Sequence, residues 1–297
     1  MVDKISDFLG YVGTERGFTS KTVEAYKHDL GKFDDFLVMK QGHGYNLADI
    51  DAGIVKSYLR FMAEKGNTAV TRGRKLATLK SFFKYLASDG VIKVDPTAQL
   101  VMPKVKQQEP SYLTEQEYKR LLDAVKENST PFFQLRDTAI VTVFLGMGLR
   151  LSELVALNVG DVNFEDGTIK VTRKGNHERI LPGNDEVMRV ISRYLDGRNK
   201  IEHDAPLFLS MRNQRIDSAS VWRVVKKHLK QAKIVKTRLS PHTLRHTFAT
   251  TLLKQGENIL TIKELMSHRN LRTTERYLHI NNDDLKAAVG RIDMGVK

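Results

Sequence analysis

The chain has 297 residues, 41% of them hydrophobic and 28% charged, so it is long enough for two globular domains with ordinary cores. It contains no cysteine, which excludes disulfides, thiolate metal ligands and a cysteine nucleophile. Lysine and arginine outnumber the acidic residues 48 to 35, and the resulting charge of +13 favours a polyanionic partner, nucleic acid before an anionic membrane.

The N-terminal segment MVDKISDFLGYVG lacks the long apolar run of a signal peptide. No stretch of the sequence approaches the roughly 18 apolar residues that a membrane span needs. The basic residues are spread along the chain instead of forming a polybasic tail, which argues against tethering to a membrane. We therefore expect a cytoplasmic protein without a membrane partner.

The first third of the sequence predicts amphipathic helices within residues 18–37, 51–66 and 67–90. Their apolar residues recur at steps of three and four, as they do along one face of a helix. These residues are Val23, Tyr26, Leu30, Phe33 and Leu37, then Ile54, Tyr58 and Met62, then Leu76, Leu79, Phe83 and Leu86. The pattern predicts a small all-α domain.

Basic residues lie off the apolar stripe of the third predicted helix. They are Arg72, Arg74, Lys75, Lys80 and Lys84. Such a face is often merely solvated, but in a chain of charge +13 it is equally consistent with contacts to phosphates. Arg72, Arg74, Lys75 and Lys80 are therefore candidate DNA-binding residues.

A linker is predicted over residues 104–111, where prolines and polar residues follow one another without helical or strand periodicity. It separates an N-terminal domain over 1–103 from a second domain over 112–297. The second domain opens with a capping box, in which Glu117 follows Thr114 by three residues ahead of an apolar run.

The second domain predicts mostly helices around one small sheet. An apolar helix is followed by a break at Gly146 and Gly148, and a further helix follows that break. Between Asp161 and Pro182, turn signals and alternating apolar residues predict three antiparallel strands. Further helices are expected over about 184–196, 218–232, 241–255, 258–267 and 273–280, with a short one in the C-terminal tail. The fold class is thus mainly α (α+β).

The stretch SPHTLRHTFATTLLKQG begins a helix, with Ser240 as its N-cap and Pro241 at its first position. His242 and Arg245 then share a face near the positive end of the helix, where an anion binds well. Three interpretations stay open: a metal site, a structural turn and an anion site. A metal is disfavoured because Thr243 stands where a zinc protease has Glu. A structural role is favoured for His246.

Two further stretches narrow the choice. In GLRLSEL, Arg150 follows two glycines and lies between two leucines, which is unusual for a solvated charge, although it could simply pair with Glu153. In the C-terminal region, His268 precedes Tyr277 by nine residues. With these two patterns, the order of motifs along the chain becomes specific.

The motifs Gly-Leu-Arg-x-Ser-Glu-Leu, His-x-Leu-Arg-His-x-Phe-Ala-Thr and His-Tyr at a spacing of nine together resemble the tyrosine recombinases, or phage integrase family. The pattern is most similar to the Xer-type site-specific recombinases. The resemblance extends over nearly the whole chain. It implies an N-terminal, SAM-like core-binding domain and a C-terminal catalytic domain that contact opposite faces of duplex DNA.

The resemblance also implies the roles of individual residues. Arg150 and Arg245 would be the two catalytic arginines, whose planar guanidiniums stabilise charge on the phosphate oxygens without a metal or other cofactor. Glu153 would support them. Arg173, beside the predicted hairpin turn, is added as a DNA-binding candidate.

Tyr277 would be the nucleophile that forms a 3′-phosphotyrosyl link, and Lys174 would protonate the 5′-oxygen leaving group. His242 would assist proton transfer near the tyrosine, and His268 would bind the phosphate. Family members commonly have Gly before that histidine, whereas this sequence has Ser267.

The implied function is recombination at a double-stranded DNA site through a Holliday junction, resolving chromosome dimers and so serving chromosome partition at cell division. The implied assembly is a tetramer of this chain, or of this chain with a related recombinase, in which the C-terminal tail docks on a neighbour. An accessory DNA translocase is a further implied partner. The alternatives are a phage or mobile-element integrase that acts in DNA integration, a non-catalytic DNA-binding protein of the same fold, and a metal-dependent hydrolase.

Overall fold

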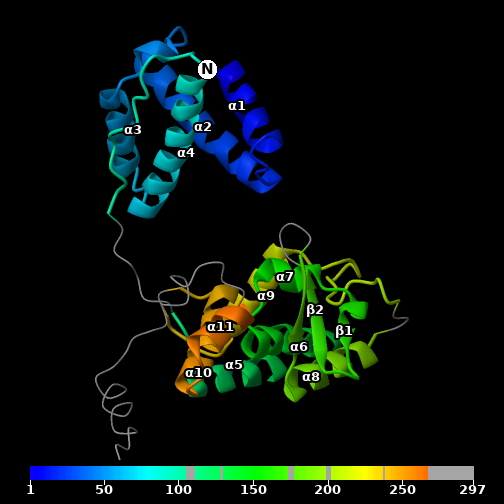
Figure 1. Ribbon diagram of the computed structural model, residues 1–297. Helices are drawn as coiled ribbons and strands as arrows, with labels where there is room; N and C mark the ends of the chain where they lie inside the picture. Colours follow the sequence, from blue (N-terminus) through cyan, green and yellow to red (C-terminus); the bar gives the residue numbers. More distant parts are fainter. Residues whose placement is uncertain (105–110, 128–129, 173–176, 199–201, 237, 267–297) are drawn as a thin grey trace, which may run out of the picture. The chain divides into compact units, whose positions relative to one another are not determined.

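The computed structural model describes residues 1–104, 111–127, 130–172, 177–198, 202–236 and 238–266. The chain divides into two compact units, Met1–Gln107 and Gln108–Lys297, and each is described by itself (Figure 1). The predicted linker overlaps residues 105–110, which lie outside the described residues. None of the helices in the described ranges combines the length and the apolar character that crossing a membrane requires.

In the described part of the first unit, all regular elements are helices (Figure 1). Its elements are α1 (Val2–Thr14), α2 (Ser20–Gln41), the 3₁₀ turn η1 (Leu47–Asp49), α3 (Ala52–Glu64) and α4 (Ala69–Ser88). The predicted helices correspond to α2, α3 and α4. Side chains cap two of them, since Asp51 accepts from the Ile54 amide at 2.8 Å and Thr68 accepts from the Thr71 amide at 3.2 Å.

Aromatic side chains fill much of the core of the first unit. Phe33 of α2 meets Tyr58 of α3 and Phe83 of α4 edge to face, at centroid distances of 5.0 and 6.0 Å. Phe8 of α1 packs on Phe82 of α4 at 5.4 Å. Helix α1 was not among the predicted helices, although its buried residues Ile5, Phe8 and Val12 are three and four residues apart.

The predicted apolar face of α3 packs on the core: Tyr58 and Met62 are buried, Ile54 is partly buried, and Val55 adds a further buried residue. One expectation about a side chain in this unit is wrong. Lys75 does not lie on an exposed basic face of α4. Its side chain is 9% exposed and its ammonium lies 3.1 Å from the Asp29 carboxylate, because α2 covers this side of α4.

The second unit is mostly helical with one small sheet, as predicted. Its elements are α5 (Glu115–Glu127), α6 (Pro131–Met147), α7 (Leu151–Ala156), η2 (Val159–Asp161), β1 (Val162–Asn163), β2 (Thr168–Thr172), β3 (Glu178–Pro182), α8 (Asp185–Asp196), α9 (Ser218–Gln231), α10 (Pro241–Lys254) and α11 (Ile259–Met266). The strands pair antiparallel in the order β1-β2-β3, with Ile169 opposite both Val162 and Leu181.

Helix α6 is the centre of the second unit. Its buried residues lie on all sides, and it packs against α5, α8, α9 and α10, as expected for a helix surrounded by other elements. Its C-terminal end therefore has a fixed position beside α10. The predicted helix over 273–280 and the C-terminal tail lie outside the described residues.

Candidate active site

The candidate site begins where α6 ends. Gly148 terminates α6 in the left-handed conformation, with φ of 59°, and its amide donates to the Phe144 carbonyl at 3.1 Å. A Cβ at this position would collide with the ring of Phe248 on α10. The turn therefore needs glycine for two reasons, its positive φ and the close approach of α10.

Arg150 follows this turn as the N-cap of α7, in extended backbone conformation. Its amide donates to Oε2 of Glu153 at 2.7 Å, and its Nη1 donates to Oε1 of the same carboxylate at 2.7 Å. One glutamate thus both caps the helix and holds the arginine side chain. The Arg150 side chain is still 37% exposed, whereas that of Glu153 is 7% exposed. The pairing considered from the sequence is present, and it leaves much of the Arg150 side chain accessible.

Arg245 reaches the same place from α10, and its side chain is only 7% exposed. Its guanidinium donates to the carbonyls of Gly148 and Met266, and Nη1 lies 3.8 Å from Oε2 of Glu153. These contacts join α10 to the α6–α7 turn and to the end of α11. Met266 is the last described residue before the segment that carries His268 and Tyr277.

The start of α10 is held by local hydrogen bonds. Ser240 is the N-cap, and its amide donates to Oγ1 of Thr243 at 3.2 Å. Thr243 Oγ1 in turn donates to the Arg238 carbonyl at 2.9 Å. One turn later, Thr247 accepts from the Leu113 amide at 2.8 Å, which ties α10 to the segment before α5. These contacts fix the turn of α10 that carries His242 and Arg245.

His242 is only partly buried and lies close to both arginines. Partial burial of its ring lowers its pKa below 6.5, and the positive charges of Arg245 and Arg150 lower that pKa further. The imidazole is therefore mainly neutral at pH 7. A neutral imidazole offers one N–H donor and one ring nitrogen that accepts a proton.

The structure thus brings together two pairs of residues, Arg150 with Glu153 and His242 with Arg245, and the two pairs are far apart in the sequence. Lys174, Arg173, His268 and Tyr277 lie outside the described residues. His246, for which a structural role was expected, is half-buried on α10. In the described ranges, no group of three or more histidine and acidic side chains is arranged to hold a metal ion.

Sequence reasoning missed the two backbone carbonyls that position Arg245. The sequence did carry an indication for the Gly148 carbonyl, since a glycine that ends an apolar helix predicts a tight turn. It carried none for the Met266 carbonyl, because that contact depends on where α11 packs. Arg179 likewise has an unexpected role: it donates to the Glu264 carbonyl and lies 3.2 Å from the Glu264 carboxylate, linking β3 to α11.

Comparison with known proteins places this site in a family. A model described as the phage integrase family matches residues 111–284, and one described as the phage integrase N-terminal SAM-like domain matches residues 5–90. The chain belongs to the phage integrase family. It is a tyrosine recombinase, an enzyme that cleaves and rejoins DNA, so the resemblance seen in the sequence is confirmed.

Relatives of known name agree with the family models. Tyrosine recombinase XerC of Thermodesulfovibrio yellowstonii is 35% identical, with 93% of this chain and 91% of the relative covered. Tyrosine recombinase XerD of Listeria monocytogenes serotype 4b is 34% identical, with 96% and 97% covered. The fold is similar to that of XerH site-specific recombinase bound to palindromic difH substrate in a post-cleavage complex. The TM-score is 0.76 at 19% identity, with 97% of this chain and 84% of the XerH chain covered.

Proposed function

We propose that Arg150, Arg245 and His242 bind the scissile phosphate of a DNA recombination site. The observation that carries this proposal is the pair of guanidiniums held by one buried carboxylate, with a neutral imidazole beside them. The guanidiniums and the carboxylate together carry a net charge of +1, which suits an anionic ligand. A fixed guanidinium stabilises charge that develops on non-bridging oxygens in the transition state without reorganising.

In the proposed reaction, the Tyr277 oxygen attacks the phosphorus. A tyrosine–phosphate bond forms at the 3′ end while the bond from phosphorus to the 5′-oxygen breaks. Lys174 gives a proton to that leaving oxygen, and the tyrosine proton passes to a base, for which neutral His242 is suited. His268 donates to the phosphate. The covalent link keeps the energy of the broken bond, so the reverse attack by a 5′-hydroxyl rejoins DNA without ATP.

The proposed biological role is Xer-type recombination in the cytoplasm, in which four protomers exchange strands through a Holliday junction and resolve chromosome dimers. The names XerC and XerD of the relatives support this role, as does XerH, which is described as bound to its difH substrate. The tetramer, built from this chain alone or with a related recombinase, and an accessory DNA translocase belong to the same proposal. So does the exchange of the C-terminal tail between protomers.

A nicked suicide substrate tests the chemistry. Such a DNA loses a short strand after cleavage, so the covalent protein–DNA adduct accumulates and is seen on a denaturing gel. We expect the adduct to form in EDTA, to disappear in Tyr277→Phe and to persist in the control Tyr118→Phe. Cleavage that needs a divalent cation and survives in Tyr277→Phe would indicate a metal-dependent hydrolase instead. DNA binding without any cleavage would indicate a non-catalytic DNA-binding protein.

A further inference from the structure

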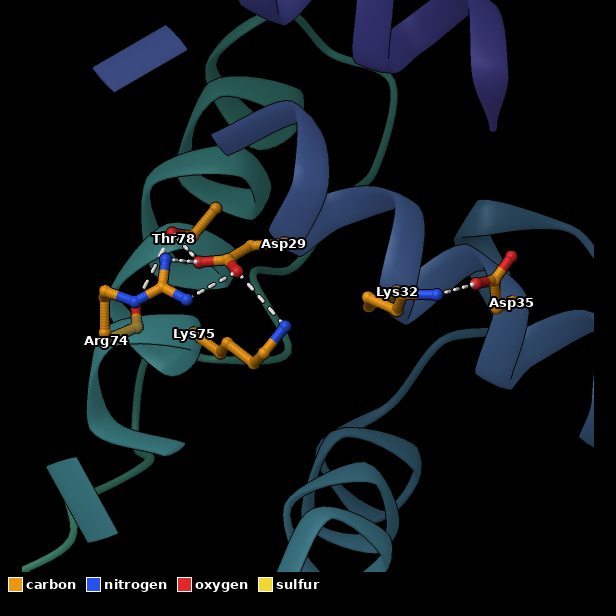
Figure 2. Close-up of polar contacts among 6 residues, drawn as sticks. All are labelled: Asp29, Lys32, Asp35, Arg74, Lys75 and Thr78. Carbon is orange, nitrogen blue, oxygen red and sulfur yellow. Dashed lines mark hydrogen bonds and ion pairs between the residues drawn. The ribbon is translucent and has the colours of Figure 1, made fainter. Parts of the chain in front are cut away.

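Asp29, in the middle of α2, is a buried acid that meets three polar side chains of α4. Asp29 as a whole is 2% exposed. Arg74 donates to its carboxylate from both Nη atoms, and the Nη2–Oδ1 distance is 2.9 Å. Lys75 Nζ also donates to Oδ1, at 3.1 Å, and Thr78 Oγ1 donates to Oδ2 at 3.2 Å (Figure 2). All four side chains lie within the first unit.

The two cations in this cluster have different surroundings. The Lys75 side chain is 9% exposed, so its ammonium compensates the Asp29 charge inside the unit. The Arg74 side chain is 51% exposed although its fork is bound to a buried carboxylate. A guanidinium has five N–H donors, and a bidentate carboxylate occupies two of them. The carboxylate therefore fixes the plane of a guanidinium that belongs to a half-exposed side chain.

From this geometry we infer that Asp29 is a positioning residue for DNA binding. It holds the Arg74 guanidinium in one orientation at the surface of α4, ready to receive a phosphate oxygen. Arginine is a flexible side chain, and fixing it before binding reduces the entropy lost on binding. The inference rests on the proposed function, since it requires that Arg74 contacts DNA, and it adds a role for an acid that itself would repel DNA.

The pair Lys32–Asp35 on the same helix offers a matched control. Its side chains are 56% and 68% exposed, and a single contact of 3.1 Å joins the Lys32 ammonium to the Asp35 carboxylate (Figure 2). An exposed pair at this spacing holds its cation weakly. Asp35→Asn and Asp29→Asn remove the same charge from the same helix, so a difference between them reports on what the buried acid does.

A positioning role for Asp29 and a simple effect of its charge predict opposite changes in DNA affinity for Asp29→Asn. Removing a negative charge from a DNA-binding surface should by itself tighten binding, and we expect Asp35→Asn to tighten it slightly or leave it unchanged. If Asp29 positions Arg74, then Asp29→Asn weakens binding despite the gain in positive charge. We expect about a threefold to tenfold weakening, matching Arg74→Ala, with the salt slope reduced by about 0.9, as for one lost phosphate contact.

The experiment measures binding of the full-length chain to an intact DNA duplex of mixed sequence, between about 50 and 200 mM salt. Asp29→Asn, Arg74→Ala and their combination form a double-mutant cycle, in which we expect the double variant to bind no worse than Arg74→Ala. Asp29→Asn/Lys75→Gln keeps the charge of the cluster while removing the fork, and it should also bind like Arg74→Ala. Circular dichroism shows whether each variant is folded.

A measurement on the unsubstituted chain covers the case in which these variants do not fold. In ¹⁵N-arginine NMR, a bidentate guanidinium gives separate, slowly exchanging Nη proton signals, and Arg74→Lys identifies those of Arg74. Fast rotation at Arg74, tighter binding by Asp29→Asn or additive effects in the cycle would each overturn the inference and leave the proposed recombinase intact. Failure of the unsubstituted chain to bind duplex DNA would overturn both.

Discussion

Glu153 lies between two arginines, and both of its oxygens are engaged. Oε1 accepts from Arg150 Nη1, while Oε2 accepts from the Arg150 amide and lies 3.8 Å from Arg245 Nη1. Without this negative charge, the two guanidiniums would repel each other in a partly buried place. The acid therefore makes it feasible to hold two cations side by side while the proposed phosphate is absent.

Glu153→Gln keeps the shape of the side chain and removes its charge. We expect the free energy of unfolding to fall by about 2 kcal/mol, less than the roughly 3–5 kcal/mol of a fully buried pair because Arg150 is partly solvated. Formation of the covalent adduct should also slow. Chemical denaturation and the suicide substrate measure the two effects. In the control Glu264→Gln, an exposed carboxylate loses its charge, and the expected change is within about 0.5 kcal/mol. Equal effects of the two substitutions would contradict the role of Glu153.

The pKa of His242 reports on the charge of the site. It is lowered first by partial burial and then by Arg245 and Arg150, so removing one arginine should raise it without restoring the ordinary value. We expect the imidazole of Arg150→Gln to titrate at higher pH than in the unsubstituted chain, as followed by NMR. Arg212→Gln, which removes a cation that does not act on His242, should leave the titration unchanged.

The same shift has a consequence for stability. Because the folded state holds the His242 pKa below 6.5, the unfolded chain takes up this proton first as pH falls. The contribution of His242 to stability is therefore present above pH 6.5 and decreases as pH falls through the unfolded and then the folded pKa.

The NMR titration also has an outcome that would contradict the cause given for the lowered pKa. If the His242 imidazole of Arg150→Gln titrated as in the unsubstituted chain, the charge of Arg150 would not act on the imidazole.

At the scale of elements, the turn between α6 and α7 sets the position of Arg150. Gly148→Ala would place a Cβ at φ of 59° and against the Phe248 ring, so α10 or the turn must move. We expect a loss of about 2 kcal/mol or more in unfolding free energy, and slower adduct formation. The control Gly10→Ala lies on the exposed side of α1 with no atom near the added Cβ, and it should stabilise the chain by up to about 1 kcal/mol. A neutral Gly148→Ala would contradict this account of the turn.

The elements that the sequence predicted well are those whose signals are local. Periodic apolar residues predicted α2, α3 and α4, and turn residues predicted the antiparallel strands. Local signals could not place Lys75, because its burial depends on Asp29, 46 residues away on α2. They also could not show that the Gly148 carbonyl holds Arg245, 97 residues further along the chain. The motifs predicted Arg150, Arg245 and His242 as site residues, and packing decides what holds them; the structure places these three near one another.

At the scale of the whole molecule, the buried residues divide into separate apolar cores. One runs from Ile5 to Leu100, and another runs from Leu113 to Leu244. A smaller cluster of α10 and α11 contains Phe248 and Met266. Each unit thus has the buried apolar residues that a domain of its size requires. The proposed boundaries, 1–103 and 112–297, leave the two larger cores intact.

We expect the fragments 1–103 and 112–297 each to fold alone, with a helical spectrum and a cooperative melting transition. In the first fragment, Phe33→Ala removes a fully buried ring and should cost about 3–5 kcal/mol, most of the stability of a domain this small. Met39→Ala on the same helix removes a side chain that is 63% exposed and should change the stability by less than about 0.5 kcal/mol. Circular dichroism during thermal and urea unfolding measures both. A fragment 1–103 that shows no cooperative transition, or that tolerates Phe33→Ala as well as Met39→Ala, would mean that its core is completed by residues beyond the proposed boundary.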